Sequence, residues 1–344
     1  MLPLQLGIEK RIALAFFTLL LVYGLFQGLL VGHLPITPFE AISVLSGGNS
    51  AAAVSTETDS LRGVVLNIRL PRTLMAAAAG AGLAMAGALM QGLFRNPLAD
   101  PSLIGVSAGA AMGAVVALVT GIIPLVPGAF LGGVGITWLL YAGARVDGRT
   151  HIATMLLMGL AINALGGAVI GFVLYQANES QTRDFFFWML GSLTRAEVNW
   201  SLTLTVLTIV LAGFVIVSRY SNALNALSLG EAEASHLGFN VSRTQGSLIL
   251  LSSLIVGSTV AACGIIGFVG LIIPHFARLI LGPDHKYVVP ASSLLGAALL
   301  VFADIGIRSG ASGEELPLGI ITSLLGAPFF IALIFLAKER VWQD

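Results

Sequence analysis

The stretch TLMAAAAGAGLAMAGALMQGLF, at residues 73–94, contains no charged residue and consists mainly of small and apolar side chains. One helix needs about 20 such residues to cross a bilayer core about 30 Å thick. The small residues within Ala76–Ala88 allow neighbouring helices to approach closely inside a membrane. This stretch therefore predicts a transmembrane helix that packs tightly against other helices.

Comparable apolar runs recur along the whole chain. The 344 residues are 56% hydrophobic and 10% charged, with a mean hydropathy of +0.94, whereas soluble domains carry about 25% charged residues. The composition predicts an all-α integral membrane protein of about ten transmembrane helices, forming a single transmembrane domain over residues 1–344. The ten runs lie at roughly 12–32, 73–94, 102–121, 122–142, 152–175, 199–218, 246–264, 266–281, 288–307 and 317–337.

The distribution of Lys and Arg predicts the orientation of these helices. An even number of helices places both termini on one side, and cytoplasmic loops carry an excess of Lys and Arg. With the termini inside, eleven of the 17 basic residues fall on the cytoplasmic side and six fall outside. We therefore expect cytoplasmic N- and C-termini, an outer loop at 33–71, a short outer interfacial helix within 176–198 and a cytoplasmic segment at 219–245.

The sequence argues against enzymatic and ion-coupled activities. A phosphate-binding loop needs a Gly-Lys pair, and no glycine precedes Lys10, Lys286 or Lys338. Ion-coupled transporters usually carry a carboxylate deep in the membrane, but the acidic residues here fall in loops or near helix ends, with Asp304 the deepest. A membrane enzyme would need clustered His or acidic residues, and the five histidines are scattered.

We therefore predict a transport subunit that carries no permanently bound cofactor or metal, with an ion-coupled secondary transporter as the competing hypothesis. The net charge of zero gives no reason to expect nucleic-acid binding.

Two arginines stand out at the start of the second predicted helix. In Arg69-Leu-Pro-Arg72, Pro71 suits a helix start because it has no N–H to leave unbonded. The arginines are three residues apart, so they share one face at the outer rim. Positive charge outside runs against the sidedness rule, and either lipid headgroups or an acidic partner would account for it. We expect Arg69→Glu or Arg72→Glu to weaken docking of such a partner without unfolding the chain.

The cytoplasmic stretch NALNALSLGEAEASHLGFNV, at residues 222–241, predicts two short amphipathic helices joined by a turn. Apolar residues recur at helical spacing, and two glycines interrupt the pattern at Gly230 and Gly238. The segment is either a plain interfacial helix pair or a coupling element that fits a groove on a cytoplasmic motor.

Six motifs, in this order along the chain, resemble the FecCD-type permeases. They are RLPRTL (69–74), GALMQGLFRNPLADPSLIGVSAGA (87–110), FWMLGSL (187–193), LSLGEAEASHLG (227–238), GFVGLIIPHFARLILGPDH (267–285) and ELPLGIITSLLGAPFF (315–330). This family is the branch of type II ABC importers that takes up vitamin B12, ferric siderophores and haem. The resemblance implies a BtuC-like ABC permease fold.

The resemblance also implies partners and sites. It implies a homodimer in the bacterial inner membrane, with two copies of a cytoplasmic ATP-binding subunit and a periplasmic substrate-binding protein. By resemblance, three arginines dock glutamates of the binding protein: Arg69, Arg72 and Arg308. Likewise, the coupling helices contain Leu229, Gly230, Glu231, Ala234, Leu237 and Gly238.

The resemblance places the transport pathway along the fifth helix, with a gate near its cytoplasmic end at Ile152, Ala153 and Thr154. Met155 and Met158 share a face there, and they either line the pathway or pack in the core.

The expected cargo is haem, because residues 159–188 resemble haem permeases and a passage lined by Met, Ala and Gly suits a flat apolar molecule. Arg183 suits a propionate, or a salt bridge with Asp184 or Glu179. A ferric siderophore and cobalamin remain the alternative cargoes.

Overall fold

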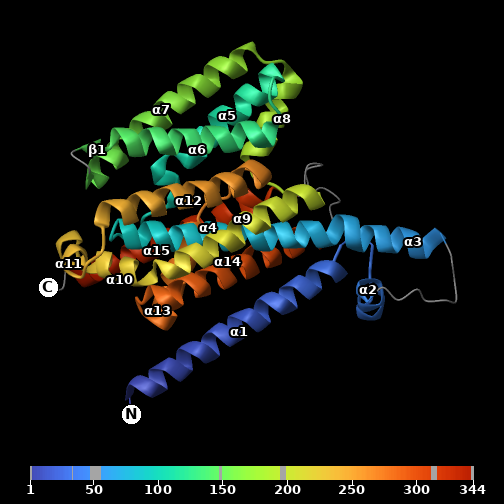
Figure 1. Ribbon diagram of the computed structural model, residues 1–344. Helices are drawn as coiled ribbons and strands as arrows, with labels where there is room; N and C mark the ends of the chain where they lie inside the picture. The colour runs from blue at the N-terminus through green and yellow to red at the C-terminus, as the bar shows by residue number, and fades with distance from the viewer. Residues whose placement is uncertain are drawn as a thin grey trace.

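The computed structural model describes residues 2–32, 34–46, 56–146, 149–193, 199–310 and 316–341. Within these residues the fold is helical apart from a two-residue hairpin formed by β1 (Arg145–Val146) and β2 (Arg149–Thr150) (Figure 1). The predicted all-α fold class is therefore confirmed.

Ten apolar helices match the ten predicted runs. Among the described residues, seven are long and apolar enough to cross a membrane: α1 (Leu2–Leu30), α4 (Leu70–Leu93), α6 (Leu125–Gly143), α7 (Ile152–Gln176), α9 (Trp200–Arg219), α12 (Val241–Cys263) and α14 (His285–Arg308). Three have shorter apolar parts: α5 (Val106–Thr120), α13 (Val269–Leu281) and α15 (Leu318–Val341).

Helix α4 forms the centre of the bundle. It packs against α14, α13, α12 and α9, and it is the most deeply buried of the seven spans. Helices α5, α6, α7 and α8 (Glu179–Met189) form a second group, which joins the first where α5 and α6 pack against α12 (Figure 1). Helix α1 lies on the outside of the bundle against α14. The buried position of α4 explains its composition of small residues.

Close contact between glycines holds α4 against α14. A Cβ atom added to Gly80 would overlap the carbonyl group of Gly296, and one added to Gly296 would overlap the carbonyl oxygen of Gly80. Because neither backbone can yield without moving its helix, the contact tolerates no side chain at either position. The close packing predicted within Ala76–Ala88 is therefore confirmed for this helix pair.

The two ends of the bundle differ. Both termini, the hairpin and the short helices α10 (Ser221–Leu229) and α11 (Glu231–His236) lie at one end, and α2 (Pro38–Leu45), α3 (Thr56–Gly63) and α8 lie at the opposite end (Figure 1). This arrangement agrees with an even number of spans. We call the first the α10–α11 end and the second the arginine end, because Arg69, Arg72 and Arg308 lie there.

Most of the described residues in the predicted outer segment at 33–71 are helical. The segment contains α2, α3 and a π-helix, η1 (Val64–Arg69), that continues directly into α4. One apolar helical stretch therefore runs from Ser60 to Leu93. The helical extension before residue 70 was not predicted, because residues 56–63 are polar and hydropathy detects only the apolar part of a helix.

Pro71 is the second residue of α4, which agrees with the position expected for it at a helix start. The π-helix η1 directly precedes α4, so the helical backbone does not begin there. The backbone N–H of Leu70 bonds the carbonyl of Val65 in the wide π turn. A local π turn adjusts the hydrogen-bond ladder next to a residue that donates no N–H, so the helix passes through the proline without ending.

Candidate functional site

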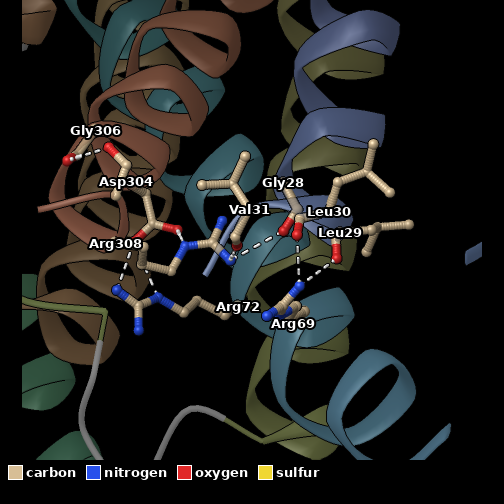
Figure 2. A network of polar contacts seen from close by, with 10 residues as sticks. Gly28, Leu29, Leu30, Val31, Arg69, Arg72, Asp304, Gly306 and Arg308 are labelled. Atoms are coloured by element: carbon tan, nitrogen blue, oxygen red, sulfur yellow. Dashed lines mark hydrogen bonds and ion pairs between the residues drawn. The ribbon is translucent and has the colours of Figure 1, made fainter. Parts of the chain in front are cut away.

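A buried ion-pair cluster occupies the arginine end, and we call Arg69, Arg72, Asp304 and Arg308 the arginine cluster (Figure 2). Arg72, on the first turn of α4, donates to Oδ1 of Asp304 from Nε at 2.9 Å and from Nη2 at 2.8 Å. Arg308, one helical turn after Asp304 on α14, places Nε 3.0 Å from Oδ2 of the same carboxylate. One carboxylate thus balances two guanidinium groups.

The cluster also fastens the end of α1. Arg69 donates from Nη1 to the carbonyls of Leu29 and Leu30, both at 2.8 Å, and from Nη2 to the carbonyl of Leu34. Arg308 donates from Nη1 to the carbonyl of Gly28 at 2.9 Å. Helix ends leave their last carbonyls without partners inside the helix, so these guanidinium groups cap α1 while they join it to α4 and α14 (Figure 2).

All three arginines are buried in the chain. Arg69 is 5%, Arg72 9% and Arg308 6% exposed, and Asp304 is 1% exposed. Their docking role stays a prediction. The burial nevertheless changes one expectation: Arg69→Glu would place a carboxylate among carbonyl oxygens, so we expect it to lower stability as well as docking.

Sequence reasoning missed the pairing of Asp304. It noted this residue only as the deepest acid. The spacing of Asp304 and Arg308, four residues apart on one helix, is a signal that could have indicated their ion pair. The pairing with Arg72 could not be found that way, because 232 residues separate it from Asp304 in the chain.

The α10–α11 end carries the predicted coupling segment. The two short helices predicted within 222–241 are confirmed as α10 and α11. Gly230 separates them with φ of +136°, and Gly238 follows α11 with φ of +87°. Backbone with φ in this range suits glycine, which explains why the helical pattern breaks at these two positions.

The side chains of this segment divide into an anchored and an exposed set. Ala234 is fully buried, and Glu231 accepts a hydrogen bond at 2.9 Å from Nε2 of Gln245 on α12. In contrast, Leu229 is 72% and Leu237 is 62% exposed. Two large apolar side chains held in water on an anchored helix pair suit a contact with another protein. The coupling role of these residues stays a prediction.

A polar contact fastens α10 to the start of α14. Asn225 on α10 donates from Nδ2 to Oδ1 of Asp284 at 2.7 Å, and its Oδ1 accepts from the backbone N–H of His285 at 2.9 Å. Asp284 also caps α14 by accepting from the N–H of Lys286 at 3.0 Å. No local sequence pattern indicates this contact, because 59 residues separate Asn225 from Asp284.

The ionisation of Asp284 follows from these neighbours. Partial burial alone would raise the pKa of its carboxyl, but the hydrogen bonds from Asn225 and Lys286 and the charges of Lys10 and Lys286 outweigh burial and hold the pKa below its usual range. Asp284 is therefore a charged cap at neutral pH.

The predicted gate lies at the start of α7. Ala153 and Thr154 are exposed, whereas Met155 is fully buried in the core and Met158 is half-buried against Gly143. For Ile152 the structure describes only the backbone, as the first residue of α7. Core packing thus accounts for Met155 in this conformation, and the pathway role of the five residues stays a prediction.

Two of the sequence motifs meet the end of α12 where α8, α12 and α15 come together. The backbone N–H of Ser192 donates to the carbonyl of Cys263 at 2.8 Å, and that of Gly319 donates to the carbonyl of Leu190 at 3.1 Å. Gly191 lies between them with φ of +71°. Residues of the two motifs therefore form a junction of backbone hydrogen bonds, and the positive φ explains the glycine at position 191.

Helix α8 lies where the sequence predicted a short outer helix, and its existence is confirmed. Arg183, Phe186 and Phe187 are exposed along it and line a shallow hollow of about 470 Å³. Among the described parts of the chain, no group of three His, Cys, Asp or Glu side chains is placed to hold a metal ion.

Comparisons with known proteins agree on one family. The FecCD transport family matches residues 19–336. The haemin transport system permease HmuU of Yersinia pestis is 40% identical over 294 residues, which is 83% of this chain and 87% of that protein. The cobalamin import system permease BtuC of Halobacterium salinarum is 40% identical over 306 residues, 86% of this chain and 82% of that protein.

A solved structure supports the same fold. It is an inward-facing conformation of an ABC transporter of metal-chelate type, which superposes with a TM-score of 0.80 at 32% sequence identity. The match covers 94% of this chain and 98% of that one.

Proposed function

Because this chain belongs to the FecCD transport family, we propose that it is the membrane-spanning subunit of an importer that carries haem into the cytoplasm. Membership makes the chain a permease of a type II ABC importer and not itself an enzyme. Such a permease works with a separate ATPase and a substrate-binding protein. The observation that carries the importer function is the family match over residues 19–336.

The two ends of the bundle supply surfaces for these two partners. We assign the ATPase to the α10–α11 end, where the exposed Leu229 and Leu237 flank the buried Ala234. We assign the binding protein to the arginine end, where Arg69, Arg72 and Arg308 gather. With this assignment the α10–α11 end and both termini are cytoplasmic, in agreement with the sidedness of Lys and Arg.

A homodimer is part of the same proposal. Helix α7 is long and apolar, yet only 11% of its most apolar stretch is buried within one chain. A second copy or lipid must cover it, and a passage between two copies would bring the predicted gate at 152–154 to its wall. Closure of the ATPase pair would move α10 and α11 and so switch the passage between outward and inward access.

Haem is the proposed cargo for two reasons. The haemin permease of Yersinia pestis is among the similar proteins, and the exposed Arg183 beside Phe186 and Phe187 suits a flat aromatic molecule that carries carboxylates. Cobalamin is the second candidate, since a cobalamin permease is equally identical to this chain. A ferric siderophore is the remaining alternative within the family.

Reconstitution tests the proposal. The permease, its ATPase and its binding protein are placed in liposomes, and ATP hydrolysis is measured with haem, cobalamin and ferric siderophores in turn. We expect haem-loaded binding protein to stimulate hydrolysis and haem to appear inside the vesicles. Stimulation by cobalamin alone would replace the cargo, and no stimulation by any of these compounds would overturn the chelate-importer function.

A further inference from the structure

We propose that Asp304 is a latch that holds Arg72 and Arg308 inside the chain, and that an acidic binding protein docks by replacing this carboxylate with its own. The inference rests on the proposed function of the arginine end. It adds a positioning residue, Asp304, to the docking surface, and it states what docking must break.

The geometry of the carboxylate supports the exchange. Both Oδ atoms of Asp304 are engaged, Oδ1 by Nε and Nη2 of Arg72 and Oδ2 by Nε of Arg308, at 2.8 to 3.0 Å. The two hydrogen bonds from Arg72 are charge-assisted and directional, and the contact with Arg308 is an ion pair. A partner carboxylate offers the same chemistry, so it can accept the hydrogen bonds of Arg72 and pair with the charge of Arg308.

Because the two arginines are buried, a partner carboxylate can bind them only by replacing the carboxylate of Asp304. Arg72 and Arg308 are 9% and 6% exposed, so a carboxylate approaching from outside finds almost no guanidinium surface to bind. Docking without any rearrangement would leave the charges of the two proteins apart, with solvent screening between them. For direct contact the arginines must turn outward. The contacts to Asp304 oppose this movement. The hydrogen bonds from Arg308 to the carbonyls of Gly28 and Val31 oppose it as well.

Release of Arg308 from Asp304 would also change the contacts at the end of α1. Arg308 holds the carbonyl of Gly28 with the same guanidinium group that meets Asp304. In its most apolar stretch α1 is only 22% buried. An outward turn of Arg308 therefore removes one of the contacts that hold the last turn of a loosely covered helix, where Arg69 keeps its bonds to Leu29 and Leu30. Binding at the surface would in this way loosen the end of α1.

Neutralising the latch is the first test. In nanodiscs, the Kd of the binding protein is measured for the wild type, Asp304→Asn and Asp304→Glu, at low and high salt. Because docking must first break these contacts, removal of the competing carboxylate predicts about fivefold tighter docking for Asp304→Asn, with Asp304→Glu close to the wild type. Asp184→Asn removes the same charge from the exposed face of α8 and is the matched control. Equal or weaker docking of Asp304→Asn, relative to this control, would overturn the latch.

An Arg72→Gln variant separates the latch from the proposed function. If Arg72→Gln binds the binding protein as well as the wild type does, the docking function itself is wrong. If Arg72→Gln weakens docking but Asp304→Asn fails to tighten it, the arginines dock their partner and only the latch is wrong.

If Asp304→Asn does not fold, hydrogen exchange on the wild-type chain tests whether docking releases the contacts of Asp304. The latch predicts that backbone amides in the last turn of α1, such as that of Val31, which bonds the carbonyl of Gln27, exchange faster when the binding protein is docked. A partner that merely covers the surface slows this exchange or leaves it unchanged, and either result would refute the proposal.

Discussion

Arg69 shows how one guanidinium group serves structure at the arginine end. Its two terminal nitrogens reach the carbonyls of Leu29 and Leu30 at the end of α1 and that of Leu34 beyond it, and the planar fork fixes the directions of these bonds. A lysine ammonium is a single point charge on a flexible stem, so it cannot occupy both nitrogen positions at once. The identity of the residue therefore matters here as much as its charge.

Arg69→Lys should lower the free energy of unfolding by about 1–3 kcal/mol, because it leaves a buried carbonyl without its donor. Arg62→Lys is the matched control, since Arg62 is exposed on the preceding helix and such surface changes stay within about 0.5 kcal/mol. Thermal unfolding in detergent measures both variants. Equal losses in the two would show that the carbonyl contacts of Arg69 contribute nothing specific.

At the scale of residues, the sequence showed which arginines lie at the candidate site, but it did not show what surrounds their side chains. The pattern Arg-Leu-Pro-Arg drew attention to Arg69 and Arg72, and both lie in the cluster. Their burial was missed, because it depends on Asp304 and on the end of α1, which are distant in the chain and reach the arginines only after folding.

At the scale of elements, the start of α14 depends on a charged cap. The pKa of Asp284 is held below its usual value of 3.8. A carboxyl with a lowered pKa in the folded state contributes stability above that usual value, and the contribution is lost as the pH falls below it. Protonation would weaken both the cap and the contact with Asn225.

Asp284→Ala should destabilise the protein by about 1 kcal/mol at pH 7, the usual cost of losing a helix N-cap. Asp284→Asn keeps a capping oxygen and should lose less. The difference between the wild type and Asp284→Asn should persist down to about pH 3.8 and shrink as the pH is lowered further, because the folded wild-type carboxyl becomes neutral only below that value. Unfolding curves across this range provide the measurement, and a difference that does not depend on pH would contradict the electrostatic account.

The contact between α4 and α14 makes a second prediction at this scale. Gly80→Ala forces a methyl group against the carbonyl of Gly296, so we expect a loss of about 1–3 kcal/mol from overpacking. Gly135→Ala in α6 is the matched control, because a Cβ added there meets nothing within 4 Å. Detergent unfolding of both variants, beside the wild type, is the measurement, and a neutral Gly80→Ala would show that the helices separate easily.

Element boundaries were predictable where a local signal marks them. Gly230 and Gly238 indicated the limits of α11, and the structure places positive φ at both. The extension of α4 through η1 was not predictable, because a π turn arises from the hydrogen-bond ladder around Pro71 and leaves no hydropathy pattern.

For the whole molecule, hydropathy and an even count of spans correctly predicted that both termini lie at one end with α10 and α11. The same patterns say nothing about what covers α7, because lipid and a second copy both accept an apolar face. The sequence does not identify the cargo either, since the haemin and cobalamin permeases share the same percentage of identical residues with this chain.

The separation of the two ends predicts that damage at one leaves binding at the other intact. Leu229→Glu and Leu237→Glu add a charge to exposed side chains of the α10–α11 end, while the buried Ala234 and the contact of Asn225 with Asp284 remain. We expect at least about tenfold weaker association with the ATPase, because a buried charge without a partner strongly opposes an apolar contact. Docking of the binding protein should be unchanged.

Ile122→Glu is the matched control for these two variants, because Ile122 is 81% exposed in the turn between α5 and α6, away from α10 and α11. It adds the same charge at an equally exposed apolar position, so it should keep ATPase association at the wild-type level. Co-purification and ATP hydrolysis in nanodiscs measure the three variants. If Ile122→Glu lost the ATPase as fully as Leu229→Glu, added charge alone would explain the effect, and α10 and α11 would no longer be the motor-binding surface.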